Sequence, residues 1–455
     1  MKINIIDLTS TEFNRGSFCY APYLCYNGLT ADNHEVTLIE AFRSEDLDDI
    51  PEADAHIVTL WSYPQIEAAT MLAQFLPFQW GKDNVYFIGY RPLIQHLGLR
   101  YVDKLLGFDP MSDSDFLKAA MLTYPLNYYN FKRLLLSDCD MHIKNKEKGE
   151  KVYPLFTSYG CPHGCSFCPS SKNCGRHRTV LSIEETFKVL DLCENEGIRH
   201  IHFTDEDFFF DIDRAYEILR HLKGKGFHLI ALGAAKVVRE YIEKYGNEAM
   251  EEAGLEVIEI GFESASPNIS DKMGAGKSLS DCEALAKIQD KITPKIFWLV
   301  LTFFIGETIE TLNKTGYFMR RNGFNMDQVV GRLRTNGTIG GLGQFFQAYH
   351  GTPIFKTLIK AGEASGMFIT DRAVRLLPSY LPHSFLYSKI RDIHPENYDA
   401  ALPWLELYNI PADKCRLEDL KIGSAIHEYI FDLPMYTQIQ NSITLAVLAR
   451  MEVIT

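Results

Sequence analysis

The sequence predicts an α/β protein in which an N-terminal flavodoxin- or Rossmann-like layer precedes a partial or full β/α barrel of the TIM type and a helical C-terminal cap. Two stretches of short apolar runs alternating with helix-like segments carry this prediction, and a charged run separates them. The 455 residues allow about three domains of ~150 residues. We assign 1–110 to the first layer, 111–152 to a linker, 153–365 to the barrel and 366–455 to a helical C-terminal region.

Composition and charge indicate a globular chain with an ample core. Hydrophobic residues make up 46% and charged residues 23% of the sequence. Lys and Arg number 46 against 59 Asp and Glu, and the net charge of −13 disfavours a nucleic-acid partner, which needs clustered cations. No apolar run reaches the ~20 residues of a membrane helix, and Met1–Asp7 is too short and too polar for a signal peptide. We expect a cytoplasmic protein with no membrane partner.

The first layer contains four strand-like runs and a helix-like segment. They are Lys2–Leu8, Glu35–Glu40, Ala55–Leu60 and Asn84–Tyr90, with the helix at Gln65–Phe75. Because such short apolar runs alternate with helices, they indicate a parallel sheet covered on both faces. The next segment breaks this rhythm and ends in the charged run Lys144–Lys151, which predicts a solvated linker.

The second alternation has six strand candidates and five helix candidates. The strands are expected at Tyr153–Thr157, His200–Thr204, His228–Leu232, Val257–Gly261, Phe297–Phe304 and Gln344–Ala348. The helices are expected at Ser182–Glu196, Asp213–Gly224, Val237–Ala253, Leu279–Lys291 and Thr308–Arg321. The first helix opens with the capping pair Ser182 and Glu185. Strand–helix units in series predict a barrel whose chemistry lies at the carboxyl ends of its strands.

Three of the ten cysteines form a cluster directly after the first barrel strand. Cys161, Cys165 and Cys168 have the spacing C-x3-C-x2-C. Thiolates are the soft ligands that iron–sulfur clusters require, and three of them can hold three irons of a 4Fe–4S cube and leave the fourth iron open. A zinc site completed by His163 or Cys174 is the alternative. The other cysteines are scattered, as buried thiols usually are.

With Phe167 just before its last cysteine, the triplet resembles the signature of the radical S-adenosylmethionine (SAM) superfamily. The resemblance implies that the open iron binds the amino and carboxylate groups of SAM. One electron, from a donor such as flavodoxin or ferredoxin, would then cleave SAM to a 5′-deoxyadenosyl radical that takes hydrogen from a small-molecule substrate. The protein would supply orientation and a dry site.

The end of the second barrel strand also resembles this family. Its segment His202-Phe-Thr-Asp-Glu-Asp-Phe208 is similar to the family's strand-two motif, which implies that polar side chains face the SAM amino group. The candidates are Thr204, Asp205 and Glu206. The alternative is a solvated acidic group or a charge set at a helix N-terminus.

The fourth barrel strand ends in Ile260-Gly-Phe-Glu-Ser264, which resembles the family's Gly-x-Glu-Ser motif. The resemblance implies that Glu263 and Ser264 reach the ribose and carboxylate side of SAM. Tyr349-His-Gly-Thr-Pro353 is similar to the strand-six turn, and His350 in it is either a proton donor or a turn residue. Cys174 is either a catalytic hydrogen donor or a buried thiol.

The N-terminal layer resembles that of the cobalamin-binding subclass of the same superfamily. Asn33–Glu40 is similar to its second strand entry and Val85–Gly89 to its fourth strand, and Trp61 at the end of the third strand would border a cofactor. The cobalt-ligating Asp-x-His-x-x-Gly motif is missing. The layer therefore either binds cobalamin without that histidine or only shapes the wall of the active site.

These alternatives define the expected functions. With cobalamin, the resemblance implies methyl transfer to an unactivated carbon or phosphorus; without it, a radical dehydration, epimerisation or rearrangement. A tRNA or protein methylthiotransferase needs three further N-terminal cysteines, and only Cys19 and Cys25 are present. An iron–sulfur or zinc sensor would leave Glu263, Ser264 and the barrel pattern unexplained.

Overall fold

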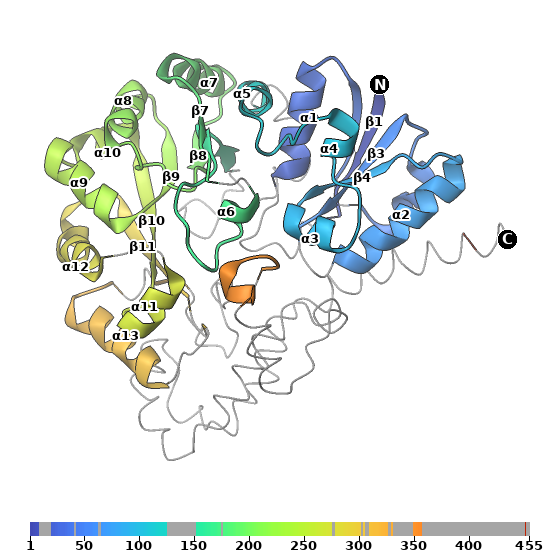
Figure 1. Ribbon diagram of the computed structural model, residues 1–455. Helices are drawn as coiled ribbons and strands as arrows, with labels where there is room; N and C mark the ends of the chain where they lie inside the picture. The colour runs from blue at the N-terminus through green and yellow to red at the C-terminus, as the bar shows by residue number, and fades with distance from the viewer. Residues whose placement is uncertain are drawn as a thin grey trace.

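The computed structural model contains two α/β lobes, each built on a parallel sheet (Figure 1). It describes residues 1–8, 20–40, 42–61, 65–124, 152–173, 176–274, 278–301, 304, 309–325, 329–330, 349–356 and 451. Within these ranges no helix is long and apolar enough to span a bilayer. Apart from residue 451, the predicted C-terminal cap lies outside the described residues, and so does the predicted strand Gln344–Ala348.

The N-terminal lobe confirms the predicted layer fold. Its sheet has the order β2-β1-β3-β4, and every neighbouring pair is parallel. The strands are β1 (Lys2–Ile6), β2 (Glu35–Ile39), β3 (Ala55–Leu60) and β4 (Val85–Gly89). The helices are α1 (Ala21–Ala31), α2 (Ile66–Trp80), α3 (Arg91–His96), α4 (Asp103–Leu106) and α5 (Ser114–Thr123), with a 3₁₀ turn at Ser44–Asp49. All six residues of β3 are buried, as expected for a central strand covered on both faces.

Helix α5 lies in the stretch that the sequence predicts as a linker. Asp113 caps its start by accepting a hydrogen bond of 2.8 Å from the Phe116 amide. The Phe116 ring packs where Gly28 leaves α1 without a side chain, and a Cβ at Gly28 would lie 2.2 Å from the ring. The helix therefore packs as part of the N-terminal lobe, whereas the domain boundaries themselves stay predictions.

The second lobe is a six-stranded parallel sheet with the order β12-β11-β10-β9-β8-β5. Its strands are β5 (Tyr153–Leu155), β8 (His200–Phe203), β9 (His228–Gly233), β10 (Leu255–Glu263), β11 (Lys295–Val300) and β12 (Val329–Val330). Five of them match predicted strands. The short strand β12 was not predicted, since two residues are too few to show an alternation.

Helices follow the strands of the barrel sheet. They are α7 (Ile183–Asn195), α8 (Ile212–Leu222), α9 (Ala235–Tyr245), α10 (Glu248–Ala253), α11 (Pro267–Met273), α12 (Leu279–Ile288), extended by a 3₁₀ turn at Gln289–Lys291, and α13 (Ile309–Arg321). The capping pair Ser182 and Glu185 is confirmed at α7. The single helix predicted over Val237–Ala253 is wrong. Gly246 has a φ of +72°, a conformation outside the helical region, and it separates α9 from α10.

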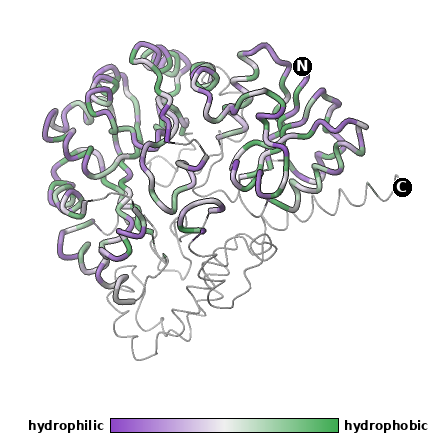
Figure 2. The backbone as a smooth tube through the Cα atoms, viewed as in Figure 1, coloured by the Kyte–Doolittle hydropathy of each residue, from purple (hydrophilic) through white to green (hydrophobic). Residues whose placement is uncertain are grey.

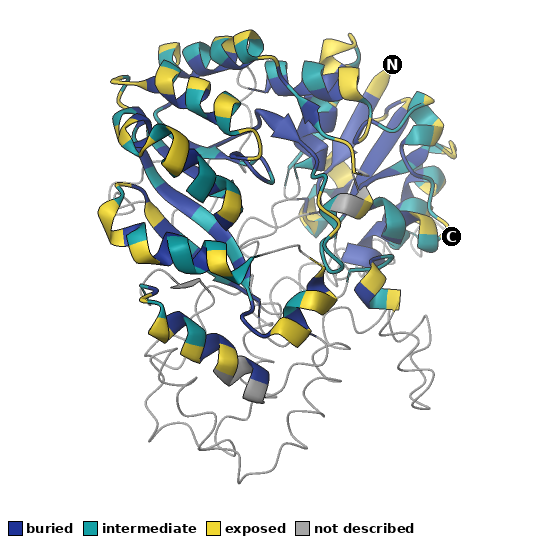
Figure 3. Ribbon diagram, turned by 60° about the vertical axis from the view of Figure 1, so that its left-hand side comes forward, coloured by how far each residue is buried: buried dark blue, intermediate teal, exposed yellow. Residues whose placement is uncertain are grey.

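The two faces of the barrel sheet differ in polarity. Phe203, Ile260 and Trp298 are buried beneath the helices, and Figure 3 shows buried residues along the strands. On the other face, His202 and Glu259 are half-buried and lie 3.9 Å apart. Hydrophilic residues also occupy the outer sides of the helices (Figure 2). The sheet is therefore apolar toward its helices and partly polar toward the barrel interior.

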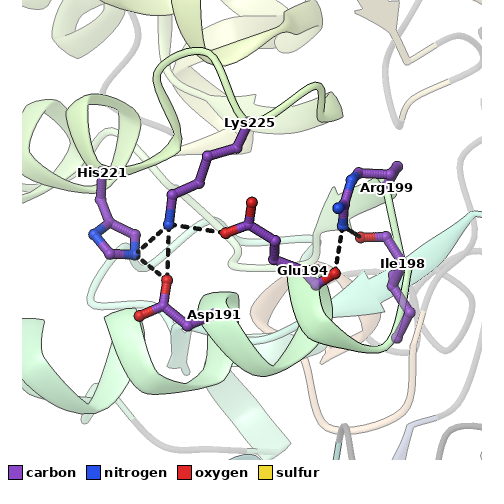
Figure 4. Close-up of polar contacts among 6 residues, drawn as sticks. All are labelled: Asp191, Glu194, Ile198, Arg199, His221 and Lys225. Atoms are coloured by element: carbon purple, nitrogen blue, oxygen red, sulfur yellow. Dashed lines mark hydrogen bonds and ion pairs between the residues drawn. The ribbon is translucent and has the colours of Figure 1, made fainter.

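A polar cluster on the outside of the barrel joins α7 to the end of α8 (Figure 4). Asp191 accepts from the Lys225 ammonium at 2.8 Å and lies 2.6 Å from His221 Nε2. Lys225 also pairs with Glu194 at 3.1 Å. The Phe187 ring stacks on His221 with 4.0 Å between centroids. Because this cluster lies on the helical outside of the sheet, we interpret it as structural.

Candidate functional site

The three clustered cysteines lie in a loop at the carboxyl end of the first barrel strand. After β5, β6 (Ser158–Tyr159) pairs antiparallel with β7 (Thr179–Val180), and the intervening chain carries Cys161, Cys165, Cys168 and the short helix α6 (Ser170–Asn173). The three thiols are half-buried. Gly160 has a φ of +95°, and a Cβ there would lie 2.3 Å from the His177 carbonyl oxygen, so only glycine fits this start of the loop.

Hydrogen bonds from Ser166 hold the middle of the loop. Its amide donates to the Met273 carbonyl at 2.7 Å, and its hydroxyl donates to the Lys272 carbonyl at 2.6 Å. Its own carbonyl accepts from the Ile354 amide at 3.2 Å. Phe167 packs edge-on against Phe304, with 6.3 Å between ring centroids. The cysteine loop is therefore tied to the segments after β10 and β11 and to the turn that contains His350.

Two of the predicted strand-two residues, Thr204 and Asp205, hold the segment that precedes the cysteine loop. Asp205 is buried and accepts hydrogen bonds from the Thr157 amide at 3.0 Å, the Thr157 hydroxyl at 2.7 Å and the Ser158 hydroxyl. Thr204 donates its hydroxyl to the Leu155 carbonyl at 3.2 Å. Both side chains thus position the β5–β6 segment, and their contact with a cofactor stays a prediction.

Glu206 reaches the cysteine loop itself. One of its carboxylate oxygens accepts from the Gly160 amide at 3.0 Å. Burial raises the pKa of this carboxyl to about 7, and the nearby charge of Asp205 acts in the same direction. Of the three strand-two candidates, Glu206 is the one whose carboxylate meets the loop that carries the cysteines.

The fourth strand ends in a strained residue. Glu263 has a φ of +65°, uncommon for a residue with a side chain, and the β10–β11 register shifts between Gly261 and Glu263. A bulge of this kind re-aims a side chain next to a functional site. Ser264 is buried, 3.2 Å from the Thr315 hydroxyl, and it accepts from the Ser266 amide. Ser264 therefore shapes this turn, and its predicted cofactor contact stays a prediction.

The thiols themselves fit the requirements of a metal-bound group. Burial raises the pKa of Cys161 to about 12, and the charge of Glu206 adds to this effect. Burial also raises the pKa of Cys168, with contributions from Glu206 and Glu263. Thiols in such a setting become thiolates when a metal supplies positive charge. Three cysteine donors on one clamped loop beside two carboxylates therefore fit an iron–sulfur cluster.

Within the described ranges, no three His, Cys, Asp or Glu side chains are grouped around a single metal position. An iron–sulfur cube takes each thiolate on a different iron, so its cysteines need not converge on one ion. Cys174, the predicted hydrogen donor, lies outside the described residues.

His350 lies where the two lobes meet. Its carbonyl oxygen accepts a hydrogen bond from the Tyr90 hydroxyl, and its ring packs on His96 with 4.1 Å between centroids. Tyr90 also contacts the Tyr349 ring at 5.9 Å. The structure thus gives His350 a place in the contact between the lobes, and its role as a proton donor stays a prediction.

The carboxyl edge of the N-terminal sheet faces the cysteine loop. Trp61 and Tyr90 follow β3 and β4, with 5.9 Å between their ring centroids. Helix α3, directly after β4, contacts α6, and Figure 1 shows these two helices facing each other. Gly89 allows the ends of β3 and β4 to approach each other closely, because a Cβ there would lie 2.6 Å from the Leu60 carbonyl oxygen. Ligands of parallel α/β sheets bind at this edge.

Comparisons with known proteins agree with this geometry. The model of the radical SAM superfamily matches residues 155–316, which carry the cysteine loop, Glu206 and Glu263. This segment is a radical SAM domain. An uncharacterized methyltransferase of Pyrococcus horikoshii is 31% identical over 179 residues, which are 39% of either chain. Cytidylyl-2-hydroxyethylphosphonate methyltransferase of Streptomyces wedmorensis is 33% identical over 79 residues, 17% of this chain and 15% of that protein. The matches therefore span well under half of these relatives.

Solved structures extend the likeness in fold to both lobes. The radical SAM methyltransferase TsrM from Kitasatospora setae, with cobalamin and a [4Fe-4S] cluster bound, superposes with a TM-score of 0.54 at 14% identity, over 79% of this chain and 78% of that chain. The cobalamin-dependent radical SAM enzyme OxsB, with aqua-cobalamin bound, gives 0.56 at 13% identity, over 99% and 80%. At this identity the likeness shows a common fold, and it confirms the predicted fold class, an α/β layer together with a β/α barrel.

Proposed function

We propose that this protein is a radical SAM methyltransferase that acts on a small biosynthetic substrate with the help of cobalamin. The observation that carries the proposal is that the carboxyl ends of the two parallel sheets lie next to each other. The cysteine loop at the carboxyl end of the barrel sheet contacts α3, at the carboxyl end of the N-terminal sheet. Two cofactor sites of the kinds that such edges provide would then face each other.

In this proposal Cys161, Cys165 and Cys168 hold a 4Fe–4S cluster, and Glu206 and Glu263 face SAM beside it. When bound, the cluster supplies the electron that cleaves SAM to a 5′-deoxyadenosyl radical, and cobalamin carries the methyl group. Asp205 and Ser166 fix the loop, so that the ligands hold their geometry through turnover. Glu263 ends β10, and its charge acts on Cys168, which supports a place for its carboxylate beside the cysteine loop.

The protein would use a small acidic electron carrier, flavodoxin or ferredoxin, as its reductant. Two relatives are named as methyltransferases, and the TsrM and OxsB structures both contain bound cobalamin. These likenesses support methyl transfer over the other radical reactions. The cobalamin-independent dehydration, epimerisation or rearrangement remains the second candidate because the cobalt-ligating motif is absent from the N-terminal layer.

Metal analysis tests the proposal directly. The full chain is reconstituted without oxygen with iron, sulfide and hydroxocobalamin, and the iron and cobalt per chain are measured after desalting. We expect about four irons for one cube and one cobalt. Replacing all three loop cysteines by alanine should abolish iron binding, whereas Cys282→Ala, at a buried thiol of α12, should not. Zinc in place of iron would overturn the proposal.

Product analysis then separates the two candidate reactions. Incubation with SAM and a reductant should yield 5′-deoxyadenosine, and cobalamin-dependent methyl transfer should add S-adenosylhomocysteine. Iron without cobalt, together with 5′-deoxyadenosine alone, would replace methyl transfer by the cobalamin-independent reaction.

A further inference from the structure

A group of basic and aromatic side chains adjoins the cysteine loop. The side chain of His163 is 45% exposed and Phe210 as a whole is 42% exposed. Their ring centroids lie 5.9 Å apart. The Arg178 guanidinium lies over the Phe210 ring, 4.9 Å from its centroid. Arg176 is exposed and lies against Gly164, where a Cβ would be 2.5 Å from the guanidinium. We call these four residues, His163, Arg176, Arg178 and Phe210, the Phe210 patch.

The charge of this patch contrasts with the rest of the molecule. The whole chain has a net charge of −13, yet no Asp or Glu occurs between Lys151 and Glu184, a stretch that contains both arginines of the patch. Within the described part of the chain, no carboxylate lies within ion-pair distance of Arg176. Two acids adjoin the patch: the buried Asp207 carboxylate lies 3.8 Å from His163 Nε2, and the exposed Asp211 caps the start of α8 by accepting from the Arg214 amide. The fixed positive charges of the patch are therefore those of Arg176, which is exposed, and Arg178, which is half-buried.

Arg178 connects the patch to the residues that hold the cysteine loop. Its guanidinium donates to the Ser158 hydroxyl at 2.9 Å and to the Asp207 carbonyl at 3.0 Å. Ser158 in turn donates to Asp205, which holds the β5–β6 segment. Phe210, an exposed large aromatic residue, is therefore held by Arg178, which is itself bonded to the segment before the cysteines. An exposed and well-held aromatic side chain is suited to anchor a partner.

We propose that the Phe210 patch is the docking surface for an acidic, flavin-carrying electron carrier of the flavodoxin type. The inference rests on the proposed function, because reductive cleavage of SAM needs one electron per event from outside the chain. Cations around an exposed aromatic ring fit a partner in which carboxylates surround a flat, partly exposed flavin. The carrier would be oxidised by one electron, which passes to the metal site of the three cysteines in the loop that contains His163 and Gly164.

Binding measurements test the surface without depending on turnover. A reduced flavodoxin is titrated against the full-length protein, and the Kd is measured by biolayer interferometry without oxygen. We expect Arg176→Glu and Phe210→Ser each to raise the Kd about tenfold or more, and binding to weaken as NaCl is raised to about 0.5 M. The matched controls are Lys287→Glu, at an exposed lysine near the end of α12, and Phe78→Ser, at an exposed aromatic residue of α2. Both should leave the Kd unchanged.

A comparison of reductants separates this inference from the proposed function. Each variant is reconstituted, its iron is counted, and SAM cleavage is followed with dithionite and with flavodoxin. We expect unchanged iron and unchanged cleavage with dithionite, and cleavage about tenfold slower with flavodoxin in the two patch variants only. Absence of cleavage by the wild-type protein with dithionite would defeat the proposed function. Normal cleavage by the patch variants with flavodoxin would overturn the docking surface alone, and so would tighter binding of a ferredoxin or of RNA at the patch.

Discussion

The two lobes share one local pattern and differ in what covers their sheets. Strand β3 of the N-terminal lobe is buried at all six positions, whereas β10 of the barrel has half-buried residues at Glu256, Glu259, Gly261 and Glu263. Among the described elements, helices cover both faces of the first sheet but only one face of the second (Figures 1 and 3). A strand with one covered face can carry polar chemistry along its length, and a strand with two covered faces can do so only at its end.

The largest effect that this comparison predicts is on the free energy of unfolding of each lobe. Ile57→Ala in β3 removes a fully buried side chain and should cost about 2–5 kcal/mol. Leu299→Ala in β11, at a half-buried position, should cost less than half as much. Amide hydrogen exchange followed by mass spectrometry reads each lobe separately. Equal costs would show that the inner face of the barrel is as closely covered as the N-terminal sheet.

The second prediction concerns the pH dependence of the barrel. Burial raises the pKa of Glu259 to about 7 from 4.5, so the folded state binds this proton more tightly than the unfolded state. Stability from this group is complete below about pH 4.5 and is lost as the pH rises to about 7. Glu259→Gln should therefore become more stable than the wild type across this window, by up to ~3 kcal/mol.

Thermal unfolding between pH 4 and pH 8 measures this difference. Glu251→Gln, at an exposed glutamate of α10, is the control and should follow the wild-type profile. A Glu259→Gln profile parallel to that of the wild type would mean that the inner face is solvated.

The third prediction tests the support of the cysteine loop. Asp205→Asn replaces one accepting carboxylate oxygen by an NH₂ group, which cannot accept from the Thr157 and Ser158 donors. We expect the free energy of unfolding to fall by about 1–3 kcal/mol. Since these bonds hold the segment before Gly160, the variant should also retain less iron after reconstitution. Thermal unfolding and iron analysis check both effects, with Asp213→Asn, at an exposed position on α8, as the control. Full iron retention would leave Asp205 with no positioning role.

The smallest effects come from helix caps, one in each lobe. Ser182→Ala at α7 and Asp113→Ala at α5 should each cost about 1 kcal/mol, because each removes a side chain that accepts from a backbone amide. Hydrogen exchange in the two helices measures them separately. If Asp113→Ala leaves α5 unchanged, residues 111–124 act as the linker that the sequence predicts.

Some of the site could be read from the sequence because its signal is local. The spacing of Cys161, Cys165 and Cys168 fixes which thiols share one loop. The predicted positions of β5, β8 and β10 place that loop and the two acidic motifs at one end of the sheet. The capping pair of α7 is equally local. The break at Gly246 was missed, since a glycine inside an amphipathic pattern does not by itself show which φ it adopts.

What each acidic side chain touches was decided by the tertiary structure. Asp205 and Glu206 are neighbours in the sequence, yet one holds Thr157 and Ser158 while the other reaches the Gly160 amide. Likewise Ser264 turns into the protein toward Thr315, although it stands beside Glu263 in the motif. Neighbouring residues of an extended segment point to opposite sides, and which side faces a cofactor depends on how the sheet packs.

By itself, the sequence determined which cysteines share a loop and the order of the strands along the chain, because these depend on spacing and periodicity. The likeness of the barrel to the radical SAM family came from the resemblance of its motifs. Only the tertiary structure brought α3 against α6, Tyr90 against His350, and Phe210 between His163 and Arg178. Tyr90 and His350 are 260 positions apart. Contacts at such separations arise when two lobes bury surface against each other, and no local pattern encodes them.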